Sequence, residues 1–232
     1  MPSPFSLVRS VWRALPGRDR LVRLPLVQRM LARAQGFARA DELYDQEYYE
    51  SVDSLGAGSM PVIAETLARE VAPHSVLDVG CGSGKLLAEL RERGIPGMGL
   101  EHSAAGIAAS RAKGLEVHPV DLATGPPVPP ERRFGAVTCL EVAEHLPPHR
   151  ADPLVQLLTL AGDAVLFTAA TPGQGGTGHL NEQPHEYWIS RFAARGFALD
   201  AAATRRLRAE WEKRGVAWWY WRNAMLFRRT PA

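Results

Sequence analysis

The residues of this chain best suited to chemistry are acids that follow short apolar segments. Asp78 lies in an apolar run of strand type, Val76–Val79, which leads into the spaced glycines Gly80, Gly82 and Gly84. Such a turn lets a ligand approach bare backbone, because glycine adopts positive φ at little cost and has no side chain. The acid beside the turn favours a ligand with a cationic group and disfavours a phosphate. The glycine spacing also differs from the G-x-G-x-x-G of dinucleotide sites.

Three further acids end strand-like segments later in the chain. Glu101 can accept hydrogen bonds from the hydroxyls of a ribose. Asp121 can accept a hydrogen bond from an exocyclic amine, with Leu122 against the face of a purine. Glu141 follows the apolar run 134–140 and bounds the same place. Because ligands of open α/β sheets bind at the carboxyl ends of the strands, these acids together predict one nucleoside site.

The apolar pattern also predicts the elements that must position these acids. Strands alternate with helices, which implies a parallel sheet with right-handed crossovers. A proline-rich loop takes the place of a long helix at 123–133. The expected strands are 75–79, 97–101, 115–119, 134–140, 163–169, 196–202 and 217–228, and the expected helices are 60–71, 84–93, 103–112, 151–160, 186–195 and 204–214.

Four segments of the chain resemble the class I S-adenosylmethionine-dependent methyltransferases. These are VLDVGCGSG, GMGLEHS, the Asp121-Leu122 pair and FGAVTCLEVAEHLP. The form Glu-Val-Ala-Glu-His-Leu-Pro is similar to the small-molecule branch, which includes quinone and natural-product O-methyltransferases. The resemblance covers residues 41–232. It implies an α/β fold with a Rossmann-like, seven-stranded, mostly parallel sheet, helices on both faces and a C-terminal antiparallel hairpin.

The resemblance implies S-adenosylmethionine as the cofactor and a set of residues that bind it. Asp78, Gly80 and Gly82 belong at its methionine end, and Glu101 belongs at the ribose. His102 either stacks near the adenine or only begins a helix without contacting the ligand. The expected cofactor-binding residues are Asp78, Gly80, Cys81, Gly82, Glu101, His102, Asp121, Leu122 and Glu141.

Two histidines are the candidates for catalysis. Transfer to an oxygen usually needs a base, and histidine suits this role because its ordinary pKa lies near neutrality. His145 is either a base beside the acceptor or a structural hydrogen-bond donor, and His179, on a glycine-rich loop, is the better base candidate. A metal bound by His179, Glu182 and His185 is conceivable, but this spacing is not specific, and no metal is expected.

The acceptor is expected to contact a second group of residues. Asn181 and His185 follow His179 on the same loop, unless that loop is merely solvated. Tyr44 and Tyr49 lie in a tyrosine-rich segment that, by resemblance, folds over the cofactor and acceptor; the alternative is packing on the sheet. The four aromatic residues 218–221 are expected to pack at the sheet edge rather than to form a platform for the acceptor.

Residues 1–40 form a basic extension with a net charge of +7, although the whole chain carries only +2. Its two helical pieces are interpreted as a cap over the substrate cleft, with weak contact to an anionic membrane surface or organelle targeting as alternatives. The remaining residues, 41–232, are expected from the resemblance to form the methyltransferase domain. Only two cysteines, no clear secretory signal and no apolar run of bilayer length favour a cytoplasmic protein. Arginine far exceeds lysine, which suggests a bacterial genome rich in G and C.

The predicted function is therefore methyl transfer from S-adenosylmethionine to a small molecule, most simply at oxygen. The acceptor would be a natural product, a sugar or a quinone-like compound. A nicotinamide-dependent dehydrogenase, a cofactor-binding module without turnover and a nucleic-acid methyltransferase remain as alternatives. Nucleic acid is not the expected partner, because no recognisable RNA-binding module accompanies the basic extension. The sequence leaves the oligomeric state open.

Overall fold

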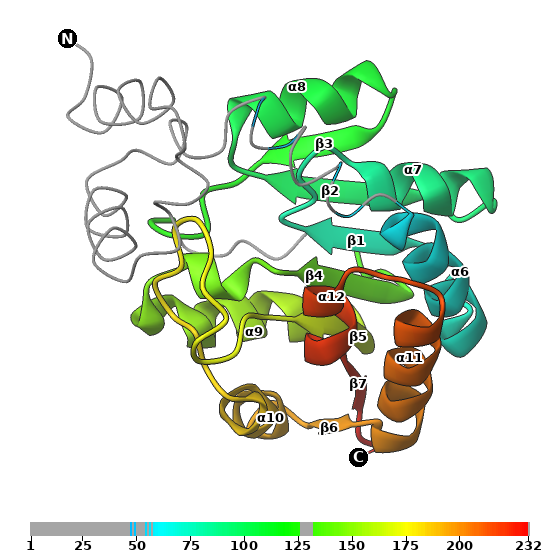
Figure 1. The fold of residues 1–232 in the computed structure, drawn as a ribbon. Helices are drawn as coiled ribbons and strands as arrows, with labels where there is room; N and C mark the ends of the chain where they lie inside the picture. The colour runs from blue at the N-terminus through cyan, green and yellow to red at the C-terminus, as the bar shows by residue number, and fades with distance from the viewer. Residues whose placement is uncertain are drawn as a thin grey trace, which may run out of the picture.

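The computed structural model describes residues 47, 49, 54, 56, 58–125 and 132–231. These residues form a seven-stranded sheet in the order β3-β2-β1-β4-β5-β7-β6 (Figure 1). Strands β1 to β5 are parallel, and β7 is antiparallel to both of its neighbours. The strands are β1 Val76–Val79, β2 Gly97–Glu101, β3 Glu116–Pro119, β4 Ala136–Leu140, β5 Ala164–Thr168, β6 Phe197–Leu199 and β7 Met225–Arg229.

Helices cover both faces of the sheet. Successive strand residues point to opposite faces, so Leu77 and Val137 contact one helical layer while Val76 and Ala136 contact the other. The first layer contains α9 Ala151–Ala161 and α10 His185–Ala193. The second layer contains α6 Ser59–Val71, α7 Lys85–Glu92 and α11 Ala201–Lys213, and α8 Ala104–Ala112 packs beside β3. The predicted fold class is thereby confirmed.

The register of the parallel strands explains why distant acids meet. Asp78 in β1 lies beside Gly99 in β2 and Thr138 in β4, and Glu101 in β2 lies beside Pro119 in β3. The carboxyl ends of these four strands therefore reach the same edge of the sheet. The turns that follow them lie side by side, as the sequence pattern predicts.

The expected last strand, 217–228, is wrong in its first half. Trp218–Asn223 forms a short helix, α12, and β7 begins only at Met225. Aromatic residues favour strands, but here Tyr220 and Asn223 are buried three residues apart, which is a helical spacing. The C-terminal antiparallel pair is β6 and β7, and α11 and α12 connect them in place of a tight turn.

The basic extension 1–40 and Tyr44 lie outside the described residues, so their predicted roles stay predictions. Within the part of the chain that the structure describes, no helix has both the length and the apolar character needed to cross a membrane.

Candidate functional site

A cavity of about 750 Å³ opens where the parallel strands end. The turns after β1, β2, β3 and β4 form much of its wall, and the loop after β5 and helix α12 complete it. This volume is typical of pockets for small molecules and cofactors. The predicted residues that line it are Tyr49, Asp78, Gly80, Cys81, Gly82, Glu101, His102, Asp121, Leu122, Glu141, His145 and His179.

The glycine turn brings backbone to the cavity wall. Gly80 has φ 75°, and a Cβ atom there would lie 2.4 Å from the side chain of Val142, so a larger residue would clash. Gly82 has φ 54°, and its N–H donates a 2.8 Å hydrogen bond to Oε2 of Glu101. The turn thus joins the ends of β1 and β2 and leaves its own backbone accessible to a ligand.

Asp78 is a buried acid, only 4% exposed, at the base of this turn. The hydroxyl of Thr138 donates a 2.6 Å hydrogen bond to its Oδ1. Burial raises the pKa of Asp78 to about 7; the Thr138 hydrogen bond opposes this rise, and the nearby Glu101 adds to it. A positive charge placed beside Asp78 would favour its ionised form, so the site favours a cationic ligand.

Glu101 is held by several donors at the start of α8. Its Oε1 accepts hydrogen bonds from the N–H groups of His102 (2.9 Å) and Ser103 (2.8 Å). The hydroxyl of Tyr49 donates to the same oxygen at 3.3 Å. These contacts fix the orientation of the carboxylate, and Oε2, which among the described residues accepts only the hydrogen bond from Gly82, keeps an acceptor position for a ligand hydroxyl. Tyr49 therefore reaches the predicted ribose acid, which supports a place for it beside the cofactor.

Asp121 and Leu122 lie in the turn after β3. Asp121 accepts hydrogen bonds from the N–H of Ala123 (2.8 Å) and the hydroxyl of Thr124 (2.5 Å). Partial burial raises the pKa of Asp121, but these hydrogen bonds outweigh it and hold the pKa below its ordinary value. Arg150 donates to the backbone carbonyl of Leu122 at 2.8 Å, which fixes the turn against η2 (Pro148–Arg150).

Glu141 follows β4 in the left-handed region, with φ 54°. Its carboxyl group accepts hydrogen bonds from Gln174 (2.9 Å) and Asn223 (3.2 Å), and Asn223 also donates to Gln174 at 2.8 Å. Burial raises the pKa of Glu141 despite these donors. The network ties the turn after β4 to the loop after β5 and to α12. Sequence reasoning missed Gln174 and Asn223, because their partners lie far away along the chain.

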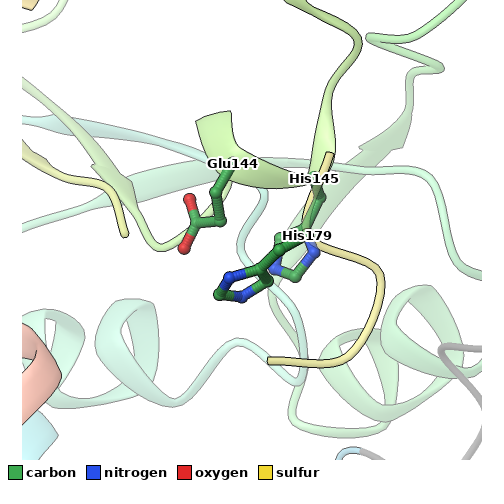
Figure 2. A group of neighbouring side chains, drawn as sticks. All are labelled: Glu144, His145 and His179. Carbon is green, nitrogen blue, oxygen red and sulfur yellow. The ribbon is translucent and has the colours of Figure 1, made fainter. Parts of the chain in front are cut away.

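Two neighbours of Glu141 in sequence complete this wall. Glu144 and His145 lie on the 3₁₀ turn η1, Ala143–His145, and Figure 2 shows His179 beside them from the loop after β5. The ring centroids of His145 and His179 are 4.9 Å apart with an interplanar angle of 81°. Burial, together with the neighbouring His179, lowers the pKa of His145 to about 3, so its ring is neutral at physiological pH.

His179 is oriented by a carboxylate. Its Nδ1 lies 2.8 Å from Oε1 of Glu182, which also accepts hydrogen bonds from the N–H groups of Gly173 (2.8 Å) and Gly175 (2.7 Å). Burial raises the pKa of Glu182, but these contacts outweigh it and leave the pKa below its ordinary value. Glu182 thus remains ionised and holds the imidazole through Nδ1, which leaves Nε2 available.

Asn181 and His185 do not line the cavity. The N–H groups of Leu180 and Asn181 both donate to the backbone carbonyl of Glu144, at 2.7 and 3.0 Å, so the chain turns inward after His179. Asn181 becomes 2% exposed, and its Oδ1 accepts a hydrogen bond from Gln183. His185 begins α10, where its Nδ1 lies 3.4 Å from Arg208. The conceived metal set of His179, Glu182 and His185 is therefore not brought together.

Helix α12 supplies aromatic side chains that the sequence interpretation placed at the sheet edge. Trp218, Trp219 and Tyr220 line the cavity, but Tyr220 also belongs to the buried core, and Trp219 and Trp221 pack against that core. Trp218 is 44% exposed and makes an edge contact with Trp219, with ring centroids 5.9 Å apart. Three of the four aromatic residues therefore pack in or against the core, and Trp218 is the most exposed of the four.

Acidic side chains outnumber basic ones around the cavity. Among the described residues that line it, Lys85 is the one lysine or arginine. The acidic lining residues are Asp78, Glu101, Asp121, Glu141 and Glu144. This excess of acids supports a ligand with positive charge and opposes a phosphate-rich one.

Residues 58–230 match the sequence profile of a family described as "Methyltransferase domain". A curated ubiquinone biosynthesis O-methyltransferase from Alkalilimnicola ehrlichii is 34% identical over 126 residues, which cover 51% of this chain and 47% of that protein. The chain thus matches about half the length of that relative.

Solved structures share the fold at low sequence identity. An amino pentose methyltransferase from Micromonospora echinaspora, involved in calicheamicin biosynthesis, superposes with a TM-score of 0.61 at 19% identity, covering 78% of this chain and 96% of that one. A sugar N-methyltransferase from a Streptoalloteichus species gives a TM-score of 0.55 at 19% identity, covering 76% and 88%.

Proposed function

Since the chain belongs to the methyltransferase-domain family, we propose that it transfers the methyl group of S-adenosylmethionine to a hydroxyl oxygen of a small molecule. The family establishes an S-adenosylmethionine-dependent methyltransferase. The choice of oxygen and the residue roles are the proposal. The observation that carries it is that one cavity is lined both by the acids and glycine turn of a cofactor site and by a histidine held by a carboxylate.

The cofactor end of the cavity fits S-adenosylmethionine in charge and shape. Buried Asp78 faces the glycine turn, where a cationic ligand would favour its ionised form. Glu101 presents a fixed carboxylate for ribose hydroxyls, and Asp121 with Leu122 would receive the adenine. Cys81 and His102 line the same wall, and Glu141 bounds it. When bound, S-adenosylmethionine supplies an already activated methyl group, so the protein mainly aligns the reactants and excludes water.

The acceptor end offers a base and an apolar surface. In the metal-free protein, Nε2 of His179 takes up the proton of the acceptor hydroxyl, while Glu182 on Nδ1 stabilises the imidazolium that forms. His145, neutral and in edge contact with His179, orients the hydroxyl. Trp218 and Trp219 provide broad faces that suit an aromatic or quinone-like acceptor. The relative from Alkalilimnicola ehrlichii, an O-methyltransferase, supports oxygen as the methylated atom.

The remaining expectations also stand as proposals. Tyr49 assists at the cofactor, and Tyr44 is proposed to contact the acceptor. Asn181 and His185 act behind the cavity wall, where they support the loop that carries His179. Cys81 and Cys139 are both buried free thiols, which supports a cytoplasmic setting.

The proposal is tested by methyl transfer to candidate acceptors. Purified protein with S-adenosylmethionine is offered hydroxylated aromatics, hydroxylated quinone precursors and amino sugars, and mass spectrometry locates the added methyl group. We expect O-methylated aromatic products from the unaltered protein, a fall of about a hundredfold or more in kcat for His179→Ala, and no change for the exposed control His149→Gln. Methylation confined to amino groups would contradict the choice of oxygen.

A further inference from the structure

The side chains of Glu144, His145 and His179 bring three potential metal ligands to one place (Figure 2). One carboxylate oxygen and one nitrogen from each ring all lie within 4.8 Å of one another. We propose that these three residues bind a divalent transition-metal ion in the wall of the cavity. Binding of the ion does not depend on the proposed function. Only the role of the ion in methyl transfer rests on that function.

Glu144 is the strongest indication of a ligand. Its side chain is completely buried, and neither carboxylate oxygen makes a hydrogen bond of normal geometry among the described residues, although the carboxyl group of Glu141 and the backbone N–H groups of Glu144 and Ala170 lie near enough to interact with it. Burying a carboxyl group without partners costs free energy, and natural proteins usually satisfy such groups. Glu144 lies in η1, and the N–H groups of Leu180 and Asn181 donate hydrogen bonds to its backbone carbonyl. These contacts hold the residue in the wall, so its carboxyl group does not simply turn to solvent. A cation between Glu144 and the two imidazoles would satisfy it.

His179 has the supporting contact that metal-bound histidines show. In metal sites, a ligating imidazole generally donates its second N–H to a carboxylate or a carbonyl, which fixes the ring and its tautomer. Glu182 lies 2.8 Å from Nδ1 of His179 and is itself fixed by the N–H groups of Gly173 and Gly175. The arrangement therefore leaves Nε2 of His179 as the nitrogen that can bind the ion. The hydrogen bond between Glu182 and His179 involves neither of the other two proposed ligands.

The spacing of the three donors needs little adjustment to bind an ion. Metal–ligand distances of about 2.1 Å place donor atoms no more than roughly 4.2 Å apart, so a movement below 1 Å closes the set. Two imidazoles and one carboxylate suit zinc, cobalt, iron or manganese better than magnesium or calcium, which prefer oxygen ligands. The acid Glu141 on the same wall makes the surroundings more favourable to a cation.

Such an ion would change how the acceptor is activated. Three protein ligands leave coordination positions open, and an acceptor hydroxyl, or two adjacent oxygens, can occupy them. The ion then lowers the pKa of the hydroxyl, and its proton passes to solvent before methyl transfer. With Nε2 of His179 bound to the ion, this route replaces His179 as the base. The substrate class would narrow to acceptors with adjacent oxygen atoms, such as catechols.

Metal binding is tested on the full chain without a histidine tag, after treatment with a chelator. Cobalt(II) and zinc(II) are titrated separately, with calorimetry for both ions and visible absorption for cobalt. We expect one equivalent to bind and to raise the midpoint of thermal unfolding. His179→Ala and Glu144→Gln should each weaken binding about tenfold or more, and Glu182→Gln should weaken it less.

The exposed His149→Ala is the matched control and should bind as the unaltered chain does. S-adenosylmethionine binding by each variant reports whether its fold is intact. The absence of metal binding at millimolar ion would overturn the proposal. It would also be overturned if His179→Ala and Glu144→Gln kept an intact fold and bound the metal as tightly as the unaltered chain does. If chelator-treated protein still methylated hydroxyls, the proposed function would stand without the metal. If metal bound with no methylation of any hydroxyl, the function alone would fail.

Discussion

The hydroxyl group of Thr138 in β4 donates a 2.6 Å hydrogen bond to the carboxyl group of Asp78 in β1. Both side chains are buried, and burial raises the pKa of Asp78 to about 7. The hydrogen bond therefore partly offsets an unfavourable setting for a carboxylate. This pair lies directly before the glycine turn, so in the proposed cofactor site it would set the charge that the ligand meets.

Thr138→Val tests that relationship. The change keeps the shape of the side chain but removes the donor, so the ionised form of Asp78 becomes less favourable. A hydrogen bond to a charged group contributes about 1.5–3 kcal/mol, so we expect S-adenosylmethionine to bind roughly tenfold or more weakly at pH 7. Calorimetric titration measures the change. An unchanged dissociation constant would show that Asp78 does not act on the cofactor.

The raised pKa of Asp78 predicts a pH dependence of cofactor binding. The free protein holds a proton on this carboxyl group below about pH 7, and a cationic ligand favours its release. Affinity should therefore fall as the pH drops from 8 to 6, approaching about tenfold per unit below the pKa. Calorimetry in buffers with different ionisation enthalpies detects the released proton. Asp78→Asn, the control, should bind weakly and lose this part of the pH dependence.

Glu182→Gln tests whether Glu182 positions His179. Glutamine can still contact Nδ1, but it carries no charge to stabilise the imidazolium, so we expect kcat to fall about tenfold or more. The dissociation constant for S-adenosylmethionine should not change, because Asp78 and Glu101 are untouched. Glu186→Gln, an exposed change on α10, is the control and should have no effect. A fall in cofactor affinity equal to the fall in kcat would point to a general loss of structure.

Trp218→Ala tests the aromatic wall formed by α12. Trp218 lines the cavity and is 44% exposed, so its removal costs little stability but takes away a face for the acceptor. We expect the KM for an aromatic acceptor to rise about tenfold, with cofactor affinity unchanged. Leu160→Ala removes another exposed apolar side chain, outside the cavity, and should leave KM as it is. If Trp218→Ala kept the same KM as Leu160→Ala and the unaltered protein, Trp218 would not belong to the acceptor site.

The residues of the proposed cofactor half of the cavity could be predicted from the sequence to lie together, because they follow strand ends in order. Asp78, Glu101, Asp121 and Glu141 each come directly from the periodic pattern of a parallel sheet, and the structure brings them to one cavity. Their positions depend on strand register, which local apolar patterns specify well. The acceptor half depends on loops and on α12, where local patterns are weaker.

The differences at the acceptor end have specific causes. His145 and His179 meet because the loop after β5 bonds to the carbonyl of Glu144, a contact between residues more than thirty positions apart. The same contact turns Asn181 away from the cavity. The aromatic run of α12 has strong strand propensity, and its tertiary contacts override that preference. Nothing in the local sequence indicates that Gln174 and Asn223 both donate hydrogen bonds to the carboxyl group of Glu141.

The most direct test of the central claim is a calorimetric titration of S-adenosylmethionine into the unaltered protein and into Glu101→Ala. The claim is that the acids and the glycine turn at the carboxyl ends of the strands hold this cofactor. We predict one binding site in the unaltered protein and an affinity at least about tenfold weaker in Glu101→Ala, since the ribose hydroxyls lose their acceptor. Equal affinities, or no heat of binding for the unaltered protein, would contradict the claim.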